Sequence, residues 1–134
     1  KVISMEKTNA RDVNLLPDPI DLVVVDASFI SLKILLPVIR KWYQEKTGSL
    51  ITLIKPQFEA GKEEAAKGAG VIRDTQVHQK VLAEVLSAAN DLNYETKGLI
   101  KSPLIGPKGN VEFLAWFQYP GKAMDVDSWV RQVI

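Results

Sequence analysis

Two short runs of branched apolar residues constrain the fold of this chain more than any other feature of its sequence. Residues 22–25 and residues 50–54 are rich in Val, Leu and Ile, and both are flanked by strand-breaking residues. Such runs are typical of strands in a parallel sheet that is buried on both faces. Between them, residues 31–44 carry apolar side chains at helical spacing behind Ser31, a natural N-cap. The pattern predicts a strand, a covering helix and a second, parallel strand.

The rest of the chain continues this alternation of strands and helices. Residues 74–92 give the clearest helix, because Val77, Val81 and Val85 fall on one stripe. Residues 58–70 carry glycines among alternating charges, which is typical of a mobile loop. The remaining expected elements are a first strand at 2–5, two strands at 96–105 and 111–119, and a closing helix at 125–134.

Strands that alternate with helices indicate an α/β, Rossmann-like fold with a mostly parallel, helix-covered sheet. The turn between residues 96–105 and 111–119 is rich in Gly and Pro, which predicts an antiparallel hairpin and one antiparallel edge strand. The chain opens on an expected strand, without a preceding helix or a Gly-rich strand-to-helix turn. We therefore expect residues 1–134 to be the carboxyl-terminal portion of a doubly wound domain that lacks its first β-α units.

Charge and composition exclude several classes of function. The 17 basic and 16 acidic residues leave a net charge of +1, which creates no long-range field for a polyanion. The absence of cysteine excludes disulfides, thiolate metal sites and a thiol nucleophile, and is compatible with the cytoplasm. No apolar run approaches the roughly 18 residues that a membrane-spanning helix needs. An RNA partner must therefore be argued from local features.

Polar residues that follow the apolar runs are the candidates for chemistry, because ligands of open α/β sheets bind at the carboxyl ends of strands. Asp26 follows residues 22–25, and Lys55 follows residues 50–54. Each candidate has a structural alternative: Asp26 as a helix cap, Lys55 as a surface lysine, Glu112 as an outward residue of an edge strand. Because the two strands are expected to be parallel, Asp26 and Lys55 project from the same sheet edge. A lysine there acts as a base only when desolvated or beside another cation.

Three motifs, in order along the chain, resemble those of a known family. They are Asp-Ala-Ser-Phe-Ile-Ser-Leu at 26–32, Leu-Ile-Lys-Pro-Gln-Phe-Glu-Ala-Gly at 53–61, and Ser-Pro-Leu-Ile-Gly-Pro-Lys-Gly-Asn-Val-Glu-Phe-Leu at 102–114. Together they closely resemble the TlyA or haemolysin A family of FtsJ-type ribosomal RNA 2′-O-methyltransferases. The resemblance covers nearly the whole chain, and three separated motifs are far more specific than one.

The resemblance implies S-adenosylmethionine-dependent methylation of a ribose 2′-hydroxyl, with ribosomal RNA or ribosomal subunits as partners. By motif match, three members of the family's Lys-Asp-Lys-Glu tetrad are Asp26, Lys55 and Glu112. The resemblance also places Asn9 and Ala10 near the adenine of the cofactor, and Asp26 near the methyl donor. The first tetrad lysine, the Gly-rich cofactor loop and a small RNA-binding domain precede this segment in the family. We therefore expect the segment alone to bind the cofactor weakly and to be inactive.

Five side chains within or near the second and third motifs are candidates for contact with RNA. Phe58 is a candidate to stack on a base, with core or lid packing as the alternative. Lys62, Lys67, Lys101 and Lys108 are candidates for phosphate contacts, with plain solvation as the alternative.

Three other functions compete with this hypothesis. A non-catalytic RNA-binding or scaffold remnant of the same fold is motivated by the missing first half and the near-neutral charge. A membrane-active haemolysin has no support from a spanning segment or a strongly basic amphipathic helix. A metal-dependent hydrolase is disfavoured because His78 is the only histidine and lies far in sequence from Asp26. We expect no metal site and a structural role for His78.

Overall fold

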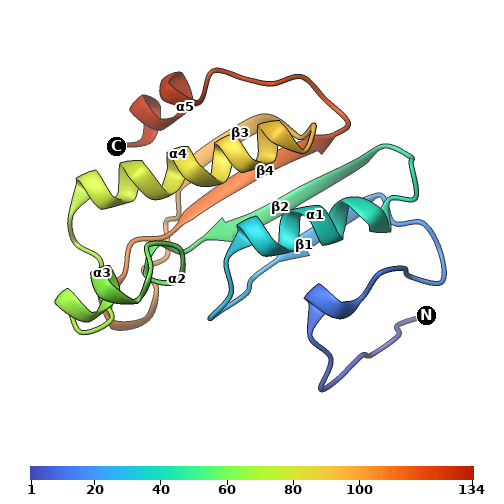
Figure 1. Cartoon of the computed structure of the whole chain (residues 1–134), viewed down its shortest axis with the longest axis horizontal. Coiled ribbons are helices and arrows are strands. Elements are labelled where there is room, and N and C mark those ends of the chain that lie inside the picture. The colour runs from blue at the N-terminus through green and yellow to red at the C-terminus, as the bar shows by residue number, and fades with distance from the viewer.

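The computed structural model describes residues 1–134, and its central feature is a four-stranded sheet (Figure 1). The strands are β1 (Leu22–Val25), β2 (Gly48–Ile54), β3 (Glu95–Lys101) and β4 (Phe113–Tyr119), in the spatial order β1-β2-β4-β3. β1 is parallel to β2, whereas β4 is antiparallel to both β2 and β3. Three strands thus share one direction and the last strand of the chain opposes them, which confirms the mostly parallel sheet with an antiparallel terminal strand.

The antiparallel strand lies inside the sheet, so the prediction of an antiparallel edge strand is wrong. β4 inserts between β2 and β3, which leaves β1 and β3 at the edges. The physical reason is its apolar sequence: Phe113, Ala115 and Phe117 are fully buried when β4 has a neighbour on each side. The expected hairpin forms, but β3 ends at Lys101 because Pro103 has no N–H group to continue the ladder.

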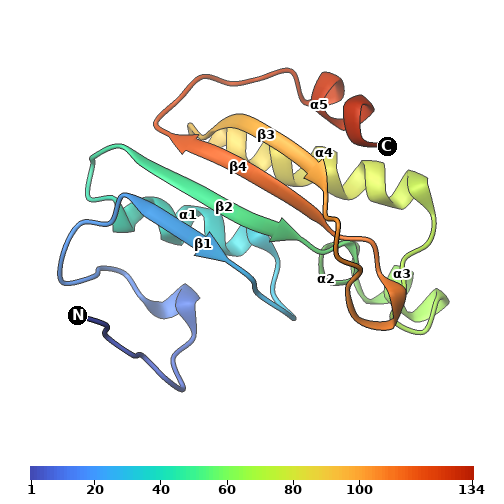
Figure 2. The same ribbon diagram turned by 180° about the vertical axis from the view of Figure 1, so that it is seen from behind.

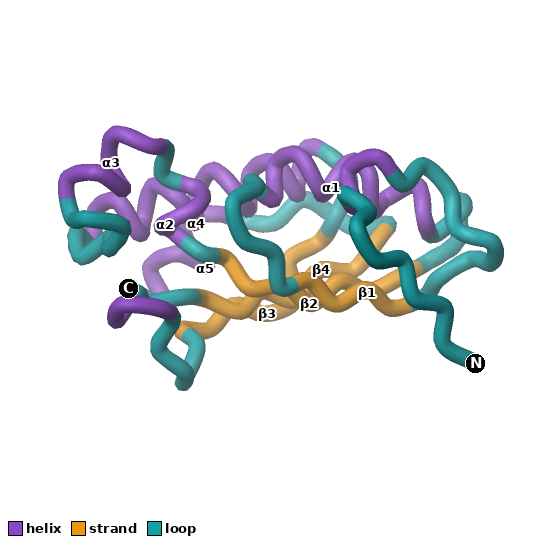
Figure 3. Tube along the Cα trace, turned by 90° about the horizontal axis from the view of Figure 1, so that it is seen from below, coloured by secondary structure: helices purple, strands orange, loops and turns teal.

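Two helices cover one face of the sheet and enclose the core. α1 (Leu32–Trp42) and α4 (Thr75–Asp91) lie side by side on this face (Figure 3), and α5 (Val126–Val133) packs against α4 and β3. The core between the helices and the sheet consists of 19 buried apolar residues. Burial raises the pKa of the Tyr43 and Tyr94 hydroxyls, so both stay protonated and donate hydrogen bonds to backbone carbonyls.

The amino-terminal segment does not form the strand expected at residues 2–5. These residues are exposed and irregular, and the chain continues into a single turn, η1 (Ala10–Asp12), beside α1 (Figure 2). An apolar run becomes a strand only when another strand completes its hydrogen bonds, and residues 2–5 have no such neighbour. β1 is likewise not buried on both faces: Val23 is buried, but Val24 is exposed because α1 and α4 cover one face only.

Residues 58–70 are not a continuous loop, contrary to the sequence prediction. They contain the end of α2 (Pro56–Glu59) and the whole of α3 (Lys62–Lys67). The sequence Lys-Glu-Glu-Ala-Ala-Lys consists of good helix formers, with acidic residues in the first turn and Lys67 in the last. Gly61 and Gly68 limit this helix to its six residues. The glycines therefore mark helix ends and not a long flexible segment.

Candidate active site

The three residues expected to carry the chemistry lie at one edge of the sheet. Asp26 directly follows β1 and Lys55 directly follows β2, so both stand at the carboxyl edge of this parallel pair. Glu112 directly precedes β4, whose first residue, Phe113, pairs with Ile54 at the end of β2. Lys55 and Glu112 are therefore the next two positions beyond the last pair of that ladder. The insertion of β4 beside β2 is what brings Glu112 into the site.

Lys55 is the centre of this cluster. Its Nζ forms an ion pair with Asp26 Oδ1 at 2.5 Å and lies 3.4 Å from Ser28 Oγ. The Lys55 side chain is only 11% exposed, so it is not a surface lysine, whereas Asp26 is 67% exposed. Asp26 does not cap α1 either, because Ser31 is the N-cap. The side chain of Lys55 is thus largely enclosed, and its amine is held between Asp26 and Ser28.

Glu112 is held in a buried position. It is 6% exposed, which excludes an outward role on an edge strand. Its Oε2 accepts a hydrogen bond from Gln57 Nε2 at 2.8 Å. The same oxygen packs on Gly106, where a side chain would collide with it. The geometry therefore gives Glu112 one orientation, in contrast to the exposed Asp26.

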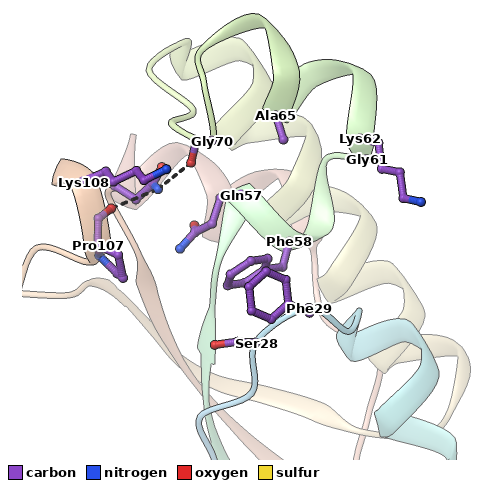
Figure 4. Close-up of a pocket in the computed structure, with 11 residues that line it drawn as sticks. Ser28, Phe29, Gln57, Phe58, Gly61, Lys62, Ala65, Gly70, Pro107 and Lys108 are labelled. Carbon is purple, nitrogen blue, oxygen red and sulfur yellow. Dashed lines mark hydrogen bonds between the residues drawn. The ribbon is translucent and has the colours of Figure 1, made fainter.

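A pocket of about 630 Å³ adjoins the charged cluster (Figure 4). Three of the five candidates for RNA contact line it: Phe58, Lys62 and Lys108. The other lining residues are Ser28, Phe29, Gln57, Gly61, Ala65, Gly70, Pro107 and Asn110. Two of these lining residues also contact the charged cluster: Ser28 contacts Lys55, and Gln57 contacts Glu112. The structure thus brings the expected RNA residues together beside the expected catalytic ones.

An aromatic pair stands at one side of this pocket. The rings of Phe29 and Phe58 lie side by side, with centroids 4.6 Å apart and planes tilted by 53° (Figure 4). Phe29 is 89% exposed and has a φ of 63°, a left-handed conformation that is unusual for a bulky residue. Strained and exposed aromatic residues are found where ligands bind more than in cores. Phe58 therefore packs against a neighbour and still faces the pocket.

Two polar contacts fasten the segments around the pocket. Glu59, the last residue of α2, accepts hydrogen bonds from Ser31 Oγ at 2.6 Å and from the Leu32 amide at 2.8 Å, at the start of α1. A carboxylate is favourable at the amino end of a helix. On the other side, the buried Asn110 accepts from the Ile72 amide and donates to the carbonyls of Gly70 and Pro107.

Several expected site residues lie outside the cluster. Asn9 caps η1 by accepting from the Arg11 amide, and both Asn9 and Ala10 are exposed on this turn beside α1. Their assignment to the adenine therefore stays a prediction. Lys101 ends β3 and does not line the pocket.

Lys67 also lies outside the pocket lining. It pairs with Glu64 at 2.9 Å, and this hydrogen bond raises the pKa of the lysine. The ion pair with Glu64 on the same helix accounts for the position of the Lys67 side chain.

His78 has a structural role, as expected. It is buried against Phe113, and its Nε2 lies 2.9 Å from the carbonyl oxygen of Ile72, close enough for a hydrogen bond. No group of three or more His, Cys, Asp or Glu side chains is arranged to hold a metal ion. None of the helices has the length and apolar character needed to cross a membrane.

The residues present fit one end of S-adenosylmethionine. Asp26 offers an exposed carboxylate at the strand edge, and a carboxylate attracts the positively charged sulfur of the methyl donor. Lys55 is beside it, where the acceptor of the methyl group would need a base.

Sequence reasoning missed the polar residues that support the site. Gln57, Glu59 and Asn110 have no charge pairing or spacing that would mark them in advance, although all three lie within the motifs at 53–61 and 102–114. Phe29 lies in the first motif and was not recognised as a partner of Phe58. The only available signal was the concentration of polar residues directly after a strand end.

The family model of FtsJ-like methyltransferases matches residues 1–119. The 16S/23S rRNA (cytidine-2′-O)-methyltransferase TlyA of Mycobacterium tuberculosis is 39% identical over 122 residues, which are 88% of this chain and 44% of TlyA. Hemolysin A of Brachyspira hyodysenteriae is 40% identical over 120 residues, 87% of this chain and 49% of that protein. The chain thus spans about half the length of the curated relatives it matches.

Solved structures show the same fold. A crystal structure described as a candidate hemolysin from Lactococcus lactis superposes with a TM-score of 0.84 at 38% identity, covering 97% of this chain and 65% of that one. A candidate hemolysin from Streptococcus thermophilus gives a TM-score of 0.83 at 36% identity, covering 97% and 49%.

Proposed function

The chain belongs to the FtsJ-like methyltransferase family, and we propose that the full-length protein methylates a ribose 2′-hydroxyl of ribosomal RNA with S-adenosylmethionine. The observation that supports this most is the cluster at the sheet edge, where the enclosed Lys55 pairs with Asp26 and stands next to Glu112 in the ladder. The name of the TlyA relative specifies methylation of a cytidine 2′-oxygen in 16S and 23S rRNA. That chemistry requires a base beside the ribose hydroxyl, and Lys55 is the amine in position to serve. Because carboxylates favour the protonated amine, we propose that the first tetrad lysine of the full-length protein supplies the neighbouring cation that a lysine base needs.

Each residue of the cluster then has a distinct role. S-adenosylmethionine, when bound, supplies a methyl group on a positively charged sulfur. Lys55, in its neutral form, would take the hydroxyl proton, directly or through water, as the ribose oxygen bonds to the methyl carbon and the methyl–sulfur bond breaks to leave a neutral thioether. Asp26 holds the amine in place, and Glu112 holds the ribose. General base assistance contributes typically 10²- to 10⁴-fold and alignment of the reactants can contribute more, so positioning outweighs the base.

The adjoining pocket is proposed to hold the RNA next to the reacting ribose. Phe58 and Phe29 present aromatic surface on which a base can stack. Lys62 and Lys108 supply positive charge for phosphates from two different segments of the pocket lining. Local features therefore provide the RNA contacts that the net charge of +1 does not suggest.

We propose that other parts of the full-length protein cover the bare face of the sheet. Val24, Ile51 and Trp116 are exposed and lie next to one another in the strand register, on the face that α1 and α4 leave open. Removing such an apolar row from water is favourable. The greater length of the relatives supports this proposal. The same parts would supply the remaining cofactor contacts and the RNA-binding domain.

A methyl-transfer assay tests the proposed function. Full-length protein is incubated with S-adenosylmethionine labelled in its methyl group and with ribosomal RNA or purified subunits. We expect the label on a ribose 2′-oxygen, recognised because the modified nucleotide resists alkaline cleavage on its 3′ side. Label on a base, or no label when the cofactor is shown to bind, would contradict the proposal.

A further inference from the structure

Gln57 occupies a position that connects the two sides of the charged cluster. It lies on the single turn α2, two residues after Lys55, and is 8% exposed. Pro56 fixes the first position of this turn, so Lys55 and Gln57 are held close to each other along the backbone. The hydrogen bond that Gln57 makes with Glu112 therefore links Glu112 to the segment that carries Lys55.

The amide of Gln57 has one partner, and that partner is Glu112. Nε2 donates to Glu112 Oε2 at 2.8 Å, whereas Oε1 is buried without any hydrogen-bond partner. A carboxylate only accepts, so the amide nitrogen must face it. An unpaired buried oxygen costs about 1–3 kcal/mol. An apolar residue would avoid that cost, so the donated hydrogen bond is the feature that accounts for a glutamine here.

The hydrogen bond from Gln57 is the one side-chain hydrogen bond that the Glu112 carboxylate accepts. Gly106 packs against the same carboxylate oxygen but has no side chain with which to orient it, and Glu112 is buried at the first position before β4. No basic side chain lies within 4 Å of it to form an ion pair, because the Lys55 amine pairs with Asp26. Gln57 is thus the side chain that sets the direction of this carboxylate relative to Lys55.

We propose that Gln57 is a positioning residue for methyl transfer, which acts by holding Glu112 in register with Lys55. This inference rests on the proposed function, in which Glu112 holds the ribose. It predicts that loss of the Gln57 donor lowers kcat and leaves the binding of cofactor and RNA intact, since Gln57 orients a catalytic group through a hydrogen bond.

Two substitutions in the full-length protein test this role. Gln57→Leu removes the donor, and we expect kcat to fall by about 10- to 100-fold with both KM values within about twofold of wild type. Gln79→Leu, on the exposed side of α4, is the matched control and should leave kcat unchanged. Urea denaturation of both variants checks that they are folded. A kcat for Gln57→Leu equal to that of the control would overturn the proposal.

Gln57→Glu gives a readout that a purely structural role would not produce. Two carboxyl groups at hydrogen-bond distance cannot both ionise, so one pKa of the pair is raised. Below that raised pKa the protonated group donates to its neighbour and restores the contact; above it the donor is lost. The ratio of variant to wild-type kcat should therefore fall as pH rises. A ratio that stays constant across the pH range would contradict the role.

A measurement without turnover separates this inference from the proposed function. In NMR spectra of the full-length protein, the Gln57 side-chain amide protons should exchange slowly with solvent, and Glu112→Ala should abolish that protection. Unprotected amide protons in an active wild-type protein would overturn the role of Gln57 alone. A wild-type protein with protected amide protons and no methyl transfer would overturn the proposed function instead.

Discussion

Two walls flank the Lys55 amine, and the first is open to solvent. We define the open wall as residues 26–31, between β1 and α1. Its carboxylate, Asp26, is 67% exposed, and Phe29 extends from it with 89% of its surface exposed. Glu59 fastens the far end of this wall to α2. The exposed groups have room for a ligand beside them.

The second wall is closed. We define the closed wall as residues 106–112, which lead into β4. Its carboxylate, Glu112, is 6% exposed and hydrogen-bonded to Gln57, and Asn110 is 2% exposed with three hydrogen bonds. Groups in such a network are strongly oriented and are costly to leave unpaired.

This difference in exposure indicates that the two carboxylates, Asp26 and Glu112, have different roles. The closed wall holds its carboxylate in one geometry, whereas the open wall leaves room for a ligand beside its carboxylate. Under the proposed function, that ligand is the methyl donor or a nucleobase of the RNA. Substitutions in the closed wall should therefore affect stability, and substitutions in the open wall should affect binding.

The largest expected effect on stability comes from Asn110. Asn110→Ala removes three hydrogen bonds to the backbone of Gly70, Ile72 and Pro107 and should lower the free energy of unfolding by on the order of 3 kcal/mol. Ser28→Ala, on the open wall, should change it by less than about 0.5 kcal/mol. Urea denaturation of both variants checks this, and equal losses would remove the distinction between the walls.

The two carboxylates themselves give the next comparison. Glu112→Ala leaves the Gln57 amide without any partner and should cost about 2 kcal/mol of stability. Asp26→Ala removes an exposed side chain together with the ion-pair partner of Lys55 and should cost about 1 kcal/mol, less than Glu112→Ala. Thermal and urea unfolding measure both. If Asp26→Ala were the more destabilising of the two, the assignment of the walls would be reversed.

Phe29 should affect RNA binding and not stability. Phe29→Ala removes a stacking surface, which we expect to weaken RNA affinity by about 1 kcal/mol, or roughly fivefold. Phe29→Tyr keeps the ring and should bind like wild type. Filter binding at one fixed salt concentration compares them. An unchanged affinity for Phe29→Ala would mean that the ring only packs against Phe58.

The smallest effect is expected from a single phosphate contact. Lys108→Gln should reduce the slope of log affinity against log salt by about 0.7 to 0.9, as expected for one lost contact. Lys101→Gln, outside the pocket lining, is the control and should leave the slope unchanged. Identical slopes for wild type and Lys108→Gln would show that Lys108 is only solvated.

The sequence predicted the open wall better than the closed wall, for a physical reason. Asp26 and Lys55 follow consecutive parallel strands, so their meeting depends on local pattern alone. Glu112 reaches the site only because β4 inserts beside β2, and that pairing joins segments distant in the chain. The resemblance to the family supplied Glu112 where the pattern of residues did not.

Other differences have similar causes. Residues 2–5 have the apolar pattern of a strand but no partner in the sheet, and pattern alone does not report pairing. The glycines at 61 and 68 indicate breaks in structure, although the six residues between them are helical. Gln57 and Asn110 matter through single hydrogen bonds, which composition and periodicity do not encode.

The rate of methyl transfer by full-length Lys55→Ala and Lys55→Arg tests the central claim most directly. We expect Lys55→Ala to lower the rate by at least about 10²-fold with cofactor affinity intact, and Lys55→Arg to restore little of it, because a guanidinium with a pKa above about 12 cannot accept a proton. Recovery of most activity by Lys55→Arg would assign Lys55 to charge stabilisation and not to proton transfer. A rate for Lys55→Ala within a few-fold of wild type would contradict the catalytic cluster and favour a non-catalytic RNA-binding role.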